Sequence, residues 1–168
     1  HVYETARARA PVFRKDSSMK TTRTKTADHL VVGTVRFTVV HANCIRIEQA
    51  AQGRFVDEPS LFAVNRVARA AFTVREQGNS VVIDTGSIRL TYRNDGAPLS
   101  ADNCRADIIH NSARAAWHPG KPNTGNLGGT AETLDGWNGA RPLAPGLLSR
   151  DGWFLLDDSR RPLLSKGW

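Results

Sequence analysis

Residues 72–96, FTVREQGNSVVIDTGSIRLTYRNDG, decide the fold, because apolar and polar side chains alternate through short runs separated by turn formers. The apolar members recur at every second position in Phe72 and Val74, and again in Ile88, Leu90 and Tyr92. A period of two is typical of a β-strand with one buried face. The turn formers around Gly78, Gly86 and Gly96 tolerate positive φ at little cost. This stretch therefore predicts antiparallel strands joined by tight turns.

The same alternation extends in both directions from this stretch. Residues 35–39 and 45–47 alternate upstream, residues 105–109 read as a further strand, and residues 61–67 form a short apolar run that could be another. No convincing amphipathic helix interrupts them, and residues 66–72 are too short to form one in isolation. Many short strands without intervening helices predict an all-β antiparallel sandwich or barrel rather than a parallel α/β fold.

A chain of 168 residues predicts one domain, with or without tails. The formal charge is +7, and residues 1–28 supply +4 of it through seven Lys or Arg against three Asp or Glu. We expect residues 1–28 to be a basic N-terminal arm or an edge strand, and residues 29–168 to be the β-sandwich domain. The basic segment lacks the interleaved aromatics that stack on bases, so we expect no nucleic-acid partner.

Composition also limits the site chemistry and the compartment. No apolar run approaches the length of a membrane span, so we expect no membrane partner. Cys44 and Cys104 form no metal motif with each other or with the histidines, and we expect neither metal nor cofactor. Cys44, inside a strand-like run, is expected to be a small core residue. The chain begins at His1 rather than Met, and both the cytosol and bacterial secretion fit two cysteines.

Residues 126–158 lack any strand or helix period. Between Gly128 and Gly152 they hold six glycines and two prolines, which predicts a long loop. Apolar side chains in this stretch favour an ordered loop over a disordered one; they are Leu134, Trp137, Leu143, Leu147 and Leu148. Long ordered loops in compact domains are often functional, so we expect a functional loop at about residues 125–152.

No catalytic group emerges from the residues themselves. Glycoside hydrolysis needs two facing carboxyl groups, and nothing brings any two of the aspartates in this region together. Asp135 and Asp151 each precede a glycine, which is typical of turns. The sequence also lacks a nucleophile elbow and a phosphate-binding loop. Trp153, followed by three apolar residues, is expected in the core. Trp137 is either a cap on the core or a platform for a ligand.

Four segments resemble the N-terminal domain of glycoside hydrolase family 31, the α-glucosidase and α-xylosidase family. They are residues 44–66 (CIRIEQAAQGRFVDEPSLFAVNR), 86–92 (GSIRLTY), 126–139 (NLGGTAETLDGWNG) and 145–159 (PGLLSRDGWFLLDDS). Their order is also that of the family. The resemblance covers roughly residues 30–168, and its later half is the more specific.

The resemblance implies a galactose-mutarotase-like antiparallel β-sandwich. In this family both catalytic aspartates belong to a following (β/α)₈ barrel, and neither lies in residues 1–168, so no catalytic residue is assigned. The expected function is that of a non-catalytic N-terminal domain of a retaining α-glycosidase. Such a domain packs on the barrel and lends a loop to the site that binds an α-linked oligosaccharide or glycoside.

The matching loop carries the candidate substrate-binding residues. The resemblance assigns Asp135 as the acceptor of a sugar hydroxyl, Trp137 as the platform and Arg150 as the clamp. Two other functions stay open on the sequence. One is a stand-alone carbohydrate-binding sandwich that uses Trp117 or Trp137 as its platform. The other is a basic nucleic-acid-binding barrel, which rests only on charge and would show steep salt dependence.

Overall fold

The computed structural model describes residues 20–22, 28–50, 52, 54–60, 63–64, 70–110, 113–129, 135–136, 138–139, 143–160 and 162–164. These residues contain β-strands and no helix. The strands are β1 (Lys20–Thr22), β2 (His29–Val32), β3 (Val35–His41), β4 (Cys44–Gln49), β5 (Thr73–Gln77), β6 (Ser80–Asp84), β7 (Ile88–Arg93), β8 (Cys104–His110) and β9 (Ala113–Trp117). The predicted all-β class is confirmed. The apolar run at residues 61–67 lies mainly outside the described residues.

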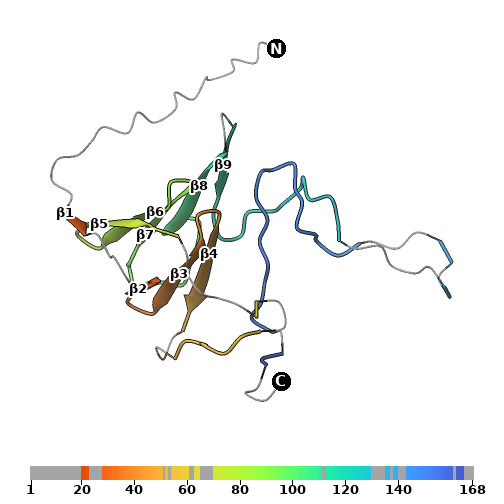
Figure 1. Ribbon diagram of the computed structural model, residues 1–168, viewed down its shortest axis with the longest axis horizontal. Coiled ribbons are helices and arrows are strands. Elements are labelled where there is room, and N and C mark those ends of the chain that lie inside the picture. The colour runs from red at the N-terminus through yellow and green to blue at the C-terminus, as the bar shows by residue number, and fades with distance from the viewer. Residues whose placement is uncertain are drawn as a thin grey trace, which may run out of the picture.

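The strands form two antiparallel sheets that face each other as a sandwich (Figure 1). One sheet has six strands in the order β1-β5-β6-β7-β8-β9, and the other has three in the order β2-β3-β4. Residues 72–96 form the middle of the large sheet, where β5, β6 and β7 follow one another as hairpins. β1, from the basic N-terminal segment, pairs with β5 at one edge, and β9 forms the opposite edge.

The core lies between the two sheets and follows the period of two. Val35, Phe37 and Val39 of β3 are fully buried, as are alternate residues of the facing strands β6, β7 and β8. The rings of Phe37 and Tyr92 meet across the sandwich with centroids 5.3 Å apart. Each such side chain contributes about 1.5–3 kcal/mol by leaving water. The alternation of apolar and polar residues in the sequence therefore reflects the burial of one face of each strand in this layer.

The two cysteines lie in different environments. Cys104 at the start of β8 is 1% exposed in the core, and burial raises the pKa of its thiol to about 11. Cys44 is exposed, so its predicted place in the core is wrong. Ile45 and Ile47 pair with Val39 and Phe37, and strict alternation turns Cys44 to the other face of β4.

The outer face of the small sheet is also covered, which buries both faces of β3. Arg36 is 7% exposed on this outer face. Its guanidinium donates to Glu48 at 2.7 Å and to Asp57 at 2.5 Å, and its Cζ lies 4.8 Å from the centroid of the Phe55 ring. Residues 54–57 thus form a strap across the sheet, held by charge-assisted hydrogen bonds to a buried cation.

Candidate functional site

The chain leaves the sandwich after β9 and returns in an irregular two-stranded ribbon, defined here as residues 123–129 and 143–153 (Figure 1). The backbone N–H of Leu127 donates to the carbonyl of Leu148 at 2.9 Å. The N–H of Arg150 donates to the carbonyl of Gly125 at 2.8 Å. Asn126 and Ser149 form a bridge between these two bonds. The predicted long loop is therefore ordered over its two arms.

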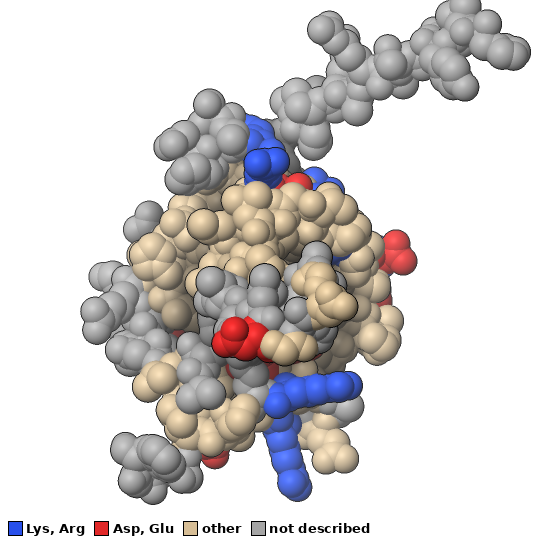
Figure 2. All heavy atoms as spheres, turned by 90° about the vertical axis from the view of Figure 1, so that its right-hand side faces the viewer, with Lys and Arg blue, Asp and Glu red and all other residues tan. Residues whose placement is uncertain are grey.

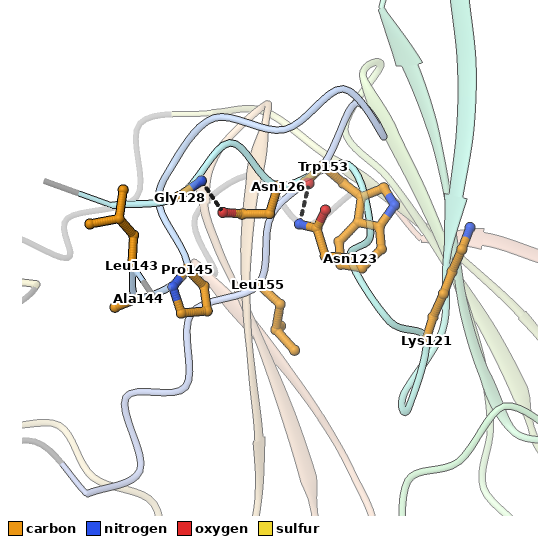
Figure 3. Close-up of a pocket in the computed structure, with 9 residues that line it drawn as sticks. All are labelled: Lys121, Asn123, Asn126, Gly128, Leu143, Ala144, Pro145, Trp153 and Leu155. Atoms are coloured by element: carbon orange, nitrogen blue, oxygen red, sulfur yellow. Dashed lines mark hydrogen bonds between the residues drawn. The ribbon is translucent and has the colours of Figure 1, made fainter. Parts of the chain in front are cut away.

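Two asparagine side chains fasten the arms together (Figure 3). Asn126 Oδ1 accepts from the N–H of Gly128 at 3.0 Å and of Gly146 at 2.8 Å, and its Nδ2 donates to the carbonyl of Gly146 at 2.9 Å. Asn123 Oδ1 accepts from Ser149 Oγ at 2.6 Å, while its Nδ2 donates to the carbonyl of Trp153 at 2.9 Å. These bonds satisfy backbone groups that an irregular ribbon leaves unpaired.

The glycines of the ribbon are required by close approach of its two arms. A Cβ on Gly146 would overlap the carbonyl oxygen of Gly128. A Cβ on Gly125 would lie 2.6 Å from Asp151 Oδ1. The same Asp151 carboxylate accepts the N–H of Gly125 at 2.9 Å. The turn predicted at Asp151 is present, since the N–H of Gly152 donates to the carbonyl of Ser149 at 3.3 Å, and the Asp151 carboxylate also joins the two arms.

Trp153 joins the ribbon to the edge of the large sheet. It is 8% exposed, which confirms its predicted place in the interior. Lys121 Nζ lies 5.8 Å from the centroid of its indole ring and donates to the carbonyl of Ala116 in β9. Gly152 lies against Ala115, since a Cβ on the glycine would stand 3.4 Å from the alanine methyl. One aromatic side chain and one cation thus hold the base of the ribbon on β9.

An open cleft of about 390 Å³ lies beside the ribbon (Figure 3). Its lining comprises Lys121, Asn123, Asn126, Gly128, Leu143, Ala144, Pro145, Trp153 and Leu155. Both asparagine amides already bond to the ribbon itself on their oxygen and nitrogen sides. Lys121 is likewise engaged with β9. These polar side chains are therefore partly committed within the fold, although N–H donors remain on Lys121 and on both amides.

The outer face of the ribbon carries exposed leucines. Asn126 lines the cleft, whereas its neighbour Leu127 and the opposite residue Leu148 do not. Leu127 is 54% exposed and Leu148 is 70% exposed. Other exposed large apolar side chains in this region are Leu143, Leu147, Phe154 and Leu155. Figure 2 shows the side of the molecule that lies to the right in Figure 1, where uncharged surface predominates among the described residues.

Of the three candidate sugar-binding residues, the structure describes Asp135 and Arg150. Asp135 is exposed in a turn with Gly136, whose φ is 77°, in a segment at the far end of the loop from the sandwich (Figure 1). Arg150 is exposed and lies in the ribbon itself, paired through its backbone with Gly125. Neither residue lines the cleft. Trp137 lies outside the described residues.

Trp117, a possible sugar platform in the stand-alone alternative, packs against the hydrophobic core at the end of β9. Its indole Nε1 is buried without a hydrogen-bond partner in the described structure. The residues that organise this region are instead Asn123 and Asn126, and the residues it presents are Leu127 and Leu148. The sequence indicated that Leu148 could pack, but it did not single out Asn123, Asn126 or Leu127. An asparagine before glycine-rich sequence also suits an ordinary turn.

Among the residues that the structure describes, no three His, Cys, Asp or Glu side chains gather where they could hold a metal ion. The described part of the chain also has no helix long and apolar enough to span a membrane. No family model matches the sequence, and a search of curated proteins finds no match either. The functional proposal therefore rests on the residues and on their geometry.

Proposed function

We propose that this chain is a non-catalytic N-terminal β-sandwich domain of a retaining α-glycosidase of glycoside hydrolase family 31. It packs on a (β/α)₈ catalytic domain of the same protein and contributes the loop at about residues 125–152 to the substrate site. The observation that supports docking is the exposed pair Leu127 and Leu148 on an ordered ribbon. The sequence resemblance supplies the identity of the partner and of the galactose-mutarotase-like fold.

The ribbon is suited to a protein partner because its shape is already set. Burying each leucine of the pair contributes about 1.5–3 kcal/mol. The hydrogen bonds of Asn123 and Asn126 hold both arms before any partner arrives, so association carries a smaller ordering cost. Apolar side chains on a preorganised surface are typical of the centre of an interface. The polar side chains of the cleft already bond within the fold, which favours this role over binding of a free sugar.

Catalysis in this proposal belongs to the partner domain. The chain lends side chains to the rim of the pocket that receives an α-linked oligosaccharide or glycoside. Asp135 is the proposed acceptor of a sugar hydroxyl, with Trp137 as an aromatic platform and Arg150 as a clamp. The exposed position of Asp135 at the far end of the loop leaves its turn accessible to a neighbouring domain.

The first test is the intact mass of the native gene product. A mass several times 18.4 kDa, together with hydrolysis of α-glycosides, supports the proposal. In that protein we expect Asp135→Ala to raise KM or lower kcat/KM, while Asp102→Ala, at an exposed turn before β8, serves as the matched control. Wild-type kinetics for Asp135→Ala would remove the residue from the site.

A second test addresses docking directly. Leu127→Ser combined with Leu148→Ser should weaken the contact between the sandwich and the catalytic domain, seen as easier proteolytic separation of the two. The control is Val31→Ser, which alters an exposed apolar residue on β2 in the sandwich itself. A native product near 18.4 kDa that binds glycans by itself would instead establish the stand-alone carbohydrate-binding function.

A further inference from the structure

The far end of the loop carries an asparagine followed by glycine, at Asn138 and Gly139. Both residues are exposed. Gly139 has a φ of 107°, and a Cβ built on it would meet nothing within 4 Å. No hydrogen bond to the described residues restrains the Asn138 side chain. Gly139 therefore has no side chain to hinder attack by its backbone nitrogen, and it follows an exposed amide group.

We propose that Asn138 is a site of spontaneous deamidation through a cyclic imide. The deprotonated backbone nitrogen of Gly139 attacks Cγ of Asn138. A bond forms between that nitrogen and Cγ, the bond from Cγ to Nδ2 breaks, and ammonia leaves with the proton taken up. Water then opens the ring. Attack at Cγ gives aspartate, whereas attack at the backbone carbonyl gives isoaspartate, in which the main chain runs through the side chain.

The structure separates Asn138 from the asparagines that fasten the ribbon. Asn123 and Asn126 each hold both amide atoms in hydrogen bonds, and their carbonyl and nitrogen atoms are fixed in orientation. They are followed by Thr124 and Leu127, whose side chains crowd the attacking nitrogen. Reaction at these two positions would require the ribbon to open first. Asn138 needs no such opening.

Asn103 is protected in a similar way at the other end of the fold. It is 4% exposed, its Oδ1 accepts the N–H of Ser100 at 2.8 Å, and its Nδ2 donates to Asp95 and to the carbonyl of Pro98. Its orientation is set by three partners, so rotation into an attacking geometry costs those bonds. Among these four asparagines the chemistry is therefore selective for the loop end, and it does not depend on the proposed function.

Deamidation changes the loop in two ways. It adds a carboxylate close in sequence to Asp135, and like charges at short range repel each other. The isoaspartate product also lengthens the main chain by one methylene group, which alters the path of an exposed turn. If the loop lines a substrate site, an aged preparation would then bind its substrate more weakly than a fresh one.

The test is incubation of the purified full-length protein at mildly alkaline pH, followed by peptide mapping and detection of isoaspartate. We expect loss of the Asn138 amide before any loss at Asn123, Asn126 or Asn103, and a rate that rises with pH. Asn138→Gln keeps an amide at the same place and should abolish the acidic product, because its ring would be larger and forms more slowly.

Two results would overturn the proposal. One is an Asn138 amide that survives as long as those of Asn123 and Asn126 in the same sample. The other is an equal yield of acidic product from Asn138→Gln. Circular dichroism of the variant confirms that the sandwich is intact, and fold loss cannot mimic either result because the control asparagines are read in the same digest.

Discussion

Ser60 and Asp158, 98 residues apart in the chain, are joined by a hydrogen bond of 2.6 Å from Ser60 Oγ to Asp158 Oδ2. Ser60 is completely buried. Ser60 also pairs with Leu163 as an isolated bridge, and the N–H of Leu164 donates to the carbonyl of Pro59 at 2.8 Å. The segment that follows the ribbon is thus returned to the segment that follows the strap, which closes the loop onto the sandwich.

Ser60→Ala should lower the free energy of unfolding by about 1–3 kcal/mol, because a partly buried carboxylate loses a hydroxyl donor. Denaturant titration measures the change. The matched control is Ser159→Ala, which removes an exposed serine bonded to Asp157 and should stay within about 0.5 kcal/mol. Equal effects from the two variants would show that the buried hydrogen bond contributes no more to stability than the exposed one.

Gly146→Ala should open the ribbon, because the new methyl would occupy the place of the Gly128 carbonyl oxygen. Overpacking of this kind costs about 1–3 kcal/mol. Hydrogen exchange measures it locally: the amides of Leu127 and Gly129 should lose protection, while that of Leu90 in β7 keeps it.

The control for this ribbon experiment is Gly136→Ala, in the same loop. A Cβ there meets nothing within 4 Å, although the φ of 77° adds some local strain. Protection at Leu127 and Gly129 should survive this change. If Gly146→Ala also left both amides protected, the two arms would not be held at the separation described above.

The decrease in the free energy of unfolding at acid pH should depend on Arg89. Burial of the Asp84 carboxylate by itself raises its pKa, but hydrogen bonds from the Arg89 side chain and the Gly86 N–H outweigh burial and leave the pKa below its ordinary 3.8. A carboxylate whose folded pKa is depressed stabilises the fold above pH 3.8, and that contribution is lost as pH falls through the lower, folded value.

Arg89→Met should therefore reduce stability near neutral pH by roughly 1 kcal/mol and flatten its fall below pH 3.8. Urea titrations at several pH values measure both effects. Arg105→Met is the comparison, because the Arg105–Asp107 pair is more exposed and should contribute less. An unchanged decrease at acid pH in Arg89→Met would show that the pair does not set the pKa of Asp84.

The sequence predicted the strands correctly where burial of one face makes apolar residues recur at every second position. The strands from β5 to β7 could be predicted because Val74, Ile83 and Leu90 all point into one layer. It failed for Cys44 because a cysteine suits either face, and the alternation of its neighbours was the better guide. The turn at Asp151, where the N–H of Gly152 donates to the carbonyl of Ser149, was predicted from the glycine neighbour of Asp151 alone. These successes all rest on interactions within a few residues of the chain.

The candidate site resisted prediction because distant contacts build it. Asn126 bonds to Gly146, 20 residues away, and the local sequence around either residue does not indicate that the two will pair. The exposure of Leu148 follows from its place opposite Leu127, which depends on the register of an irregular ribbon. Apolar composition indicated that the loop could pack, but the face on which each leucine would lie required the pairing itself.

The hydrogen bond from Lys121 to Ala116 also bears on how the protein behaves in a crowded solution. β9 is the last strand of the large sheet, and a bare strand edge can recruit the edge of another molecule. An incoming strand would have to displace the ammonium group from this carbonyl, which would leave a charge without its partner beside the new strand. Lys121, which supports the ribbon, therefore also opposes the addition of another strand at the β9 edge of the sheet.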